Sequence, residues 1–87
     1  MSWQDCNATE RDVLVSLFRE EGKTNREIMA DIDRSEMAVS RAVRSLKDKG
    51  LVDREDGPTG RGGTANSLSE KGRAVVTAQA DKFAEAL

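Results

Sequence analysis

The side chains best suited to chemistry in this 87-residue chain are basic and hydroxyl groups that recur at helical spacing between positions 36 and 47. If the apolar positions of this segment (Val39, Val43 and Leu46) face inward, the opposite side of the helix is polar. It then carries Glu36, Met37, Ser40, Arg41, Arg44 and Lys47. Arginine can grip guanine edges bidentately, serine is a tolerant donor, and arginine or lysine can reach phosphates. The pattern suits a helix lying in the major groove of DNA, although such charges can also simply solvate an exposed helix face.

The elements that must position this helix are predicted from capping signals. Thr24 and Glu27 form a capping box that begins a short second helix. Residues 33–35 break the helical period, and Ser35 caps the third helix, over residues 36–49. A short helix, a three-residue turn and a longer helix match a helix-turn-helix.

A glycine-rich hairpin is expected after the third helix. Residues 51–56 and 64–68 read as two strands, and Arg61 lies at the tip of the loop between them. Between residues 34 and 64 the chain has seven basic and five acidic residues, a net charge of +2, which leaves −4 for the remainder. The positive charge therefore lies where a DNA-facing surface would be, and the loop with Arg61 favours DNA binding over a merely solvated helix face.

The ends of the chain complete the expected architecture. Residues 1–8 are interpreted as an N-terminal tail, and residues 9–87 as one domain whose first helix is capped by Thr9 and stopped by Gly22. A last helix spans about residues 70–87. The fold class predicted is mainly α with a small β-hairpin, in the order helix, helix, helix, strand, loop, strand, helix.

Composition excludes several other classes of protein. The chain has no His and one Cys, with 14 basic and 16 acidic residues and a formal charge of −2. Without His it lacks the commonest general base and metal ligand, and one Cys can neither form an internal disulfide nor complete a zinc site. No apolar run approaches the roughly 20 residues of a membrane span. We expect a cytoplasmic, nucleoid-associated protein with no enzymatic activity, metal or cofactor.

From position 9 to about position 76 the chain resembles a winged helix-turn-helix transcription regulator of the MarR-like type. The resemblance is carried by four short motifs in the family's order and spacing, which together cover about four fifths of the chain. They are Asn25-Arg26-Glu27-Ile28, Ala38-Val39-Ser40-Arg41, Leu46-Lys47-Asp48-Lys49-Gly50-Leu51-Val52 and Leu68-Ser69-Glu70-Lys71-Gly72. It implies a recognition helix in the major groove, a wing at the minor groove or backbone, and a homodimer on a palindromic site.

The resemblance also implies roles for individual residues. The residues that would face bases or nearby phosphates are Ser35, Met37, Ser40 and Arg41. Arg44 and Lys47 would face phosphates, and Arg61 would contact the DNA from the wing. Glu36 would accept from cytosine or stabilise the helix start, and Arg34 is counted with the DNA contacts. The chain departs from full-length members by being short. It lacks room for the flanking helices that build their dimerisation domain and effector pocket, which makes a small-molecule effector doubtful.

The last helix bears on assembly, and the use of the fold stays open. Val76, Ala80, Phe83 and Leu87 recur at heptad-like spacing, which predicts a homodimer seam. The alternative is that this face packs back on the first helix. We expect this packing for Val75 and Val76, whereas Phe83 and Leu87 lie beyond a compact three-helix core. An alternative to DNA binding is a winged helix used for protein contacts within a transcription or replication assembly, because the fold hosts both uses.

Overall fold

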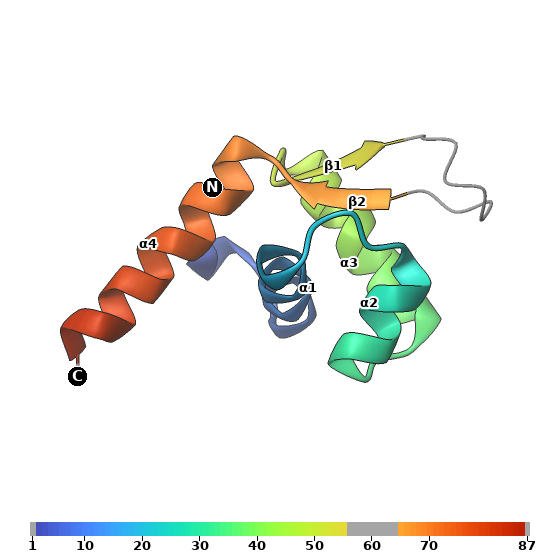
Figure 1. The fold of residues 1–87 in the computed structure, drawn as a ribbon, viewed down its shortest axis with the longest axis horizontal. Coiled ribbons are helices and arrows are strands. Elements are labelled where there is room, and N and C mark those ends of the chain that lie inside the picture. The colour runs from blue at the N-terminus through green and yellow to red at the C-terminus, as the bar shows by residue number, and fades with distance from the viewer. Residues whose placement is uncertain (1, 56–64, 87) are drawn as a thin grey trace.

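The computed structural model describes the backbone of residues 2–55 and 65–86 and the side chains of residues 2–54 and 65–81. Three helices surround a core, a two-stranded hairpin lies over them, and a long last helix extends past the three-helix body (Figure 1). The elements are η1 (Trp3–Asp5), α1 (Ala8–Arg19), α2 (Asn25–Ile32), α3 (Glu36–Asp48), β1 (Val52–Glu55), β2 (Ala65–Leu68) and α4 (Glu70–Ala86). The predicted glycine-rich loop, with Arg61, lies outside the described residues.

Helix α1 begins two residues earlier than the sequence pattern predicted. The cap is Asn7 rather than Thr9: the Asn7 side chain accepts from the Glu10 amide at 2.8 Å, and the Glu10 carboxylate accepts from the Asn7 amide at 2.9 Å. This reciprocal box satisfies two free amides at once. The helix ends at Arg19, before Gly22, whose φ of +79° serves the turn that follows.

The predicted helix-turn-helix is confirmed at both of its caps. Thr24 and Glu27 form the capping box of α2, and the Ser35 hydroxyl accepts from the Ala38 amide at the start of α3. Asp33 adopts a left-handed conformation with φ of +53° and ends α2. The turn between the two helices is therefore set by residues within it.

Helix α3 ends in a Schellman motif around Gly50. The Gly50 amide donates to the Lys47 carbonyl at 3.0 Å, and the Leu51 amide donates to the Leu46 carbonyl at 2.9 Å. Gly50 has a φ of +77°, which a residue without a Cβ adopts at little cost. This motif delivers the chain from α3 directly into the hairpin.

The hairpin is antiparallel, and Val52 is paired with Leu68 at its base. Asn66 of β2 also bridges to Lys23, just before α2, through a backbone hydrogen bond of 2.9 Å. The base of the hairpin is thereby fixed to the start of the helix-turn-helix. At the start of α4, a Cβ at Gly72 would overlap the Leu51 carbonyl oxygen, so the helix and the residue just before β1 are in direct backbone contact.

The core is one apolar cluster shared by α1, α2, α3, the hairpin and α4. The predicted inward stripe of α3 (Val39, Val43 and Leu46) is buried in it. Val76 of α4 also lies in this cluster, so its side chain is used by the domain itself. The N-terminal segment joins the same packing, because Cys6 is buried in the cluster and Trp3 packs against it. Within the described ranges, no helix has the length and apolarity needed to cross a membrane.

Candidate nucleic-acid interface

The side of α3 opposite the core is exposed and basic. Ser40, Arg41, Arg44 and Lys47 are all exposed there, as the helical spacing predicted. Met37, in the first turn, is 63% exposed, an unusually open position for a large apolar side chain. The first turn also presents the exposed carboxylate of Glu36, which suits the positive end of the helix.

Three cations of this face have no partner in the described part of the chain. Among the described residues, Arg41, Arg44 and Lys47 make no hydrogen bond or ion pair through their side chains. Arg34 differs, because its Nε and Nη2 donate to Asp12 Oδ2 of α1 at 3.0 and 2.8 Å. Arg34 therefore ties the turn before α3 to α1.

A groove of about 390 Å³ runs between α3 and the hairpin. Its lining includes Ser40, Arg44 and Lys47 from α3, Arg54 from β1, and Asn25, which is the first residue of α2. The remaining lining residues are Val43 and Asp48.

Arg54 was not among the site residues predicted from the sequence. The period of two in a strand could have found it. Val52 and Arg54 share one face of β1, and because Val52 is buried in the core beside α3, Arg54 must point to the same side.

A buried hydrogen-bond network fixes the wall of this groove. Asn66 is fully buried, and its Nδ2 donates to the Lys23 carbonyl at 3.0 Å and to Asn25 Oδ1 at 2.9 Å. The ammonium of Lys23 in turn donates to the Ser16 carbonyl and hydroxyl and pairs with Asp31 at 3.2 Å. The hairpin, the start of α2 and α1 are thus connected by polar contacts that the local sequence pattern does not reveal.

The last turn of α3 is anchored to α1 by a buried carboxylate. Glu10 accepts from Ser45 Oγ at 2.9 Å and from Lys49 Nζ at 2.8 Å, and Lys49 also donates to the Asp5 carbonyl. Burial raises the pKa of Glu10, but hydrogen bonds from Asn7, Lys49 and Ser45 outweigh it and hold the pKa below its ordinary value. The hydrogen bond to Glu10 raises the pKa of Lys49. The pair is therefore charged near neutral pH.

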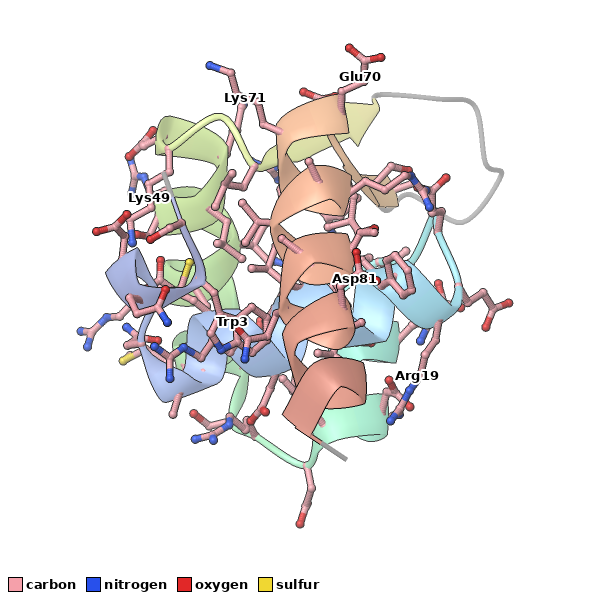
Figure 2. The ribbon with its side chains drawn as sticks, turned by 90° about the vertical axis from the view of Figure 1, so that its left-hand side faces the viewer. Trp3, Arg19, Lys49, Glu70, Lys71 and Asp81 are labelled. Carbon is pink, nitrogen blue, oxygen red and sulfur yellow. The ribbon has the colours of Figure 1, made fainter. Side chains whose placement is uncertain are left out.

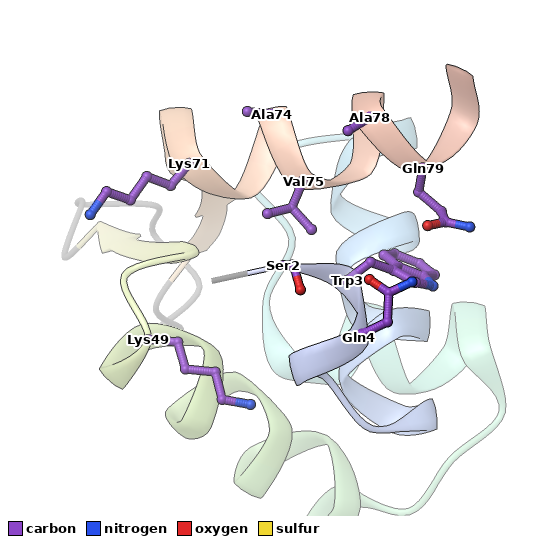
Figure 3. A pocket seen from close by; sticks show the side chains of 9 residues that line it. All are labelled: Ser2, Trp3, Gln4, Lys49, Lys71, Ala74, Val75, Ala78 and Gln79. Carbon is purple, nitrogen blue, oxygen red and sulfur yellow. The ribbon is translucent and has the colours of Figure 1, made fainter. Parts of the chain in front are cut away.

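A second hollow, of about 440 Å³, lies between η1 and α4 (Figure 3). Trp3 forms one wall, with Gln4 and Gln79 beside it, and Val75 points in from α4. Lys49 lines the hollow but is held by Glu10 (Figure 2 shows its place at the edge of the molecule). Within the described part of the chain, no cluster of His, Cys, Asp or Glu could hold a metal ion.

Comparison with solved structures places the fold among MarR-type regulators, as the motifs predicted. The Staphylococcus aureus MepR–DNA complex matches with a TM-score of 0.86 at 24% identity, over 93% of this chain and 67% of that one. Apo MarR from E. coli gives 0.76 at 26% identity, over 83% and 53%. A MarR family regulator from Neisseria meningitidis gives 0.74 at 28% identity, over 94% and 60%. The chain thus spans between about half and two thirds of these proteins.

The family itself follows from a comparison of sequence. No curated protein matches the chain. A family model described as "Sugar-specific transcriptional regulator TrmB" matches residues 5–79, which include the whole helix-turn-helix, the hairpin and the first half of α4. The chain belongs to the TrmB family of transcriptional regulators.

Proposed function

We propose that this chain binds double-stranded DNA as a transcriptional regulator, with α3 in the major groove and the loop of the hairpin at the minor groove or backbone. The observation that carries the proposal is the exposed side of α3, where Arg41, Arg44 and Lys47 have no ion-pair partner among the described residues. A cation without an internal partner is available to a phosphate or a base edge. The MepR–DNA complex, on a similar fold, supports the assignment.

Base contacts are assigned to the first turns of α3. Ser40 and Arg41 donate to base edges, with Arg41 suited to the O6 and N7 acceptors of guanine. Met37 offers its exposed side chain to apolar groups such as a thymine methyl. Glu36 accepts from cytosine N4 or stabilises the helix start, and Ser35, whose hydroxyl caps α3, stands beside the same bases.

Phosphate contacts are assigned to the flanks of that face. Arg44 and Lys47 reach the backbone from the later turns of α3. Arg34 reaches it from the turn before α3, where Asp12 orients the guanidinium and leaves one of its terminal nitrogens free of that pair. Arg61, outside the described residues, enters from the loop.

The active form is proposed to be a homodimer, which matches the two-fold symmetry of palindromic sites. The seam lies on the C-terminal half of α4, which extends beyond the three-helix body in Figure 1. Of the four seam positions suggested by the sequence, Ala80 is exposed, whereas Val76 is buried in the core cluster of its own domain. The side chain of Phe83 and all of Leu87 lie outside what is described.

The proposal is tested by selecting preferred duplexes from a random pool and then titrating selected and generic duplexes at several salt concentrations. Binding should weaken log-linearly with salt. Arg44→Gln should reduce the salt slope by about one unit on both duplexes, whereas Arg41→Gln should weaken the selected duplex about tenfold more than the generic one. Arg19→Gln, an exposed arginine on α1, is the matched control.

A folded protein that enriches no sequence from the pool and does not bind the generic duplex would contradict DNA binding and favour a winged helix used for protein contacts. The dimer has a separate test, light scattering at micromolar concentration. Phe83→Glu should convert a dimeric mass into a monomeric one, and a monomeric mass for the unmodified chain would refute the seam.

A further inference from the structure

The groove between α3 and β1 collects three cations from two separate elements. Arg44 and Lys47 come from α3 and Arg54 from β1, while Asp48 is the one acid in the lining. Among the described residues, none of these three cations has an ion pair. The groove therefore carries a net positive charge that nothing inside the described structure neutralises.

Asn25 contributes an oriented neutral donor to the same groove. Asn66 Nδ2 donates to the Lys23 carbonyl, which identifies this end of the Asn66 amide as the nitrogen. The same Nδ2 donates to Asn25, so the Asn25 atom that faces it is the oxygen, Oδ1. Because Asn25 Oδ1 is taken by Asn66, the Nδ2 group of Asn25 is left for the groove that this residue lines. Asn66 is fully buried, so this orientation is held from within the fold.

Three cations and an amide donor around one groove suit a tetrahedral anion with several acceptor oxygens. We propose that this groove seats one phosphodiester of the DNA backbone, and that Arg54 and Asn25 contact it together with Arg44 and Lys47. The inference rests on the proposed function, and it adds a contact from the hairpin strand and one from α2 to those already assigned to α3.

The expected consequence is geometric. Arg41 lies on the exposed face of α3 outside the groove, whereas Arg54 belongs to a strand whose base is tied to α2 by the Asn66–Lys23 bridge. A phosphate held jointly by α3, β1 and α2 fixes the angle at which α3 meets the duplex. The contact is made to the backbone, so it should act equally on every sequence.

The test uses two variants and two matched controls on the full chain. Arg54→Gln removes a groove cation, and Arg19→Gln removes an arginine that Figure 2 shows on the far side of the molecule from α3. Asn25→Asp keeps an oxygen to accept from Asn66 but replaces the donor by a negative charge. Gln79→Glu makes the same charge change on α4. Salt slopes are measured by anisotropy on the generic duplex and on one selected from a random pool, with thermal unfolding as the folding check.

We expect Arg54→Gln and Asn25→Asp to reduce the salt slope by about one unit each and to weaken both duplexes by about five- to tenfold at 0.1 M salt. The ratio between selected and generic affinity should not change. Arg54→Lys should restore the slope, because a lysine still neutralises one phosphate. The two controls should keep the slope of the unmodified chain.

The two proposals fail in different ways. If the unmodified chain binds DNA and Arg41→Gln weakens it, but the groove variants keep the slope of their controls, DNA binding stands and the phosphate seat is wrong. If Arg54→Gln changes the ratio between selected and generic affinity, the residue reads bases and the phosphate seat is again wrong. If the folded chain binds no duplex, the proposed function fails and the seat fails with it.

Discussion

Helix α3 and the residue that caps it carry two kinds of cation, and they differ in what surrounds them. Arg41, Arg44 and Lys47 are exposed and have no ion pair among the described residues. Lys49, just past the end of the same helix, is held at 2.8 Å by the buried carboxylate of Glu10. The comparison shows that the sequence position of a cation does not by itself indicate its role. A cation paired with a carboxylate of the fold contributes to stability, whereas an unpaired cation is available to a ligand. The free energy of unfolding should separate the two kinds.

The largest effect on the free energy of unfolding is expected from loss of the Glu10–Lys49 pair. Glu10→Ala removes a buried carboxylate that accepts from Lys49 and Ser45, and with it half of the α1 capping box, so the partly buried Ser45 and Lys49 lose this acceptor. We expect a loss of about 3 kcal/mol in the free energy of unfolding, measured by urea denaturation. A loss below about 1 kcal/mol, the range of an exposed ion pair, would mean that the pairing of Lys49 does not set it apart from the exposed cations of α3.

Acid should weaken the same pair. The pKa of Glu10 is lowered in the folded protein, so its stabilisation is present above the ordinary value of 4.5 and is lost as the pH falls through the lower folded value. Glu10→Gln, which does not titrate, should therefore lose less stability than the unmodified chain between about pH 5 and pH 3. Thermal melts of both proteins across this range would show it. Parallel curves would mean that Glu10 does not contribute to the acid response.

Arg34 offers an intermediate case, because it is paired but exposed. Its contact with Asp12 joins two side chains that are 37% and 46% exposed. Arg34→Ala should cost about 0.2–1 kcal/mol in the free energy of unfolding, since solvent screens such a pair. Raising the salt concentration should shrink the difference. A cost near that of Glu10→Ala would mean that exposure does not govern these pairs.

The smallest effect is expected on the unpartnered face. Arg44→Gln should change the free energy of unfolding by less than about 0.5 kcal/mol, because the side chain makes no ion pair with a described residue. The same variant should lose DNA affinity, so stability would respond to the cation that is paired within the fold and binding to the cations that are not. A loss above about 1 kcal/mol would give Arg44 a role in the fold.

The features that could be predicted from the sequence are those governed by neighbouring residues. The Thr24 capping box, the Ser35 cap and the apolar stripe of α3 each depend on positions within a turn or two, and each is confirmed. The position of the α1 cap was missed, because Asn7 and Thr9 are both good capping residues and only the Glu10 side chain decides between them.

The features that the sequence did not reveal join residues far apart in the chain. Glu10 and Lys49 are 39 positions apart, and Asn66 and Asn25 are 41 positions apart. A periodicity within one helix carries no information about such pairs. The burial of Val76 in the core cluster, by contrast, agrees with the expectation that this part of α4 packs back on the domain.

The close approach of Gly72 to Leu51 has a consequence for mutational scanning and for directed evolution of this protein. Every residue other than glycine would bring a Cβ into the Leu51 carbonyl oxygen, so each replacement must displace α4 from the backbone of Leu51. In a selection scored only by gene repression or activation, position 72 would therefore register as intolerant, with alanine as damaging as larger residues are. From such a score, Gly72 could be mistaken for a residue that contacts DNA, although its intolerance reflects the steric contact between the backbones of α4 and Leu51.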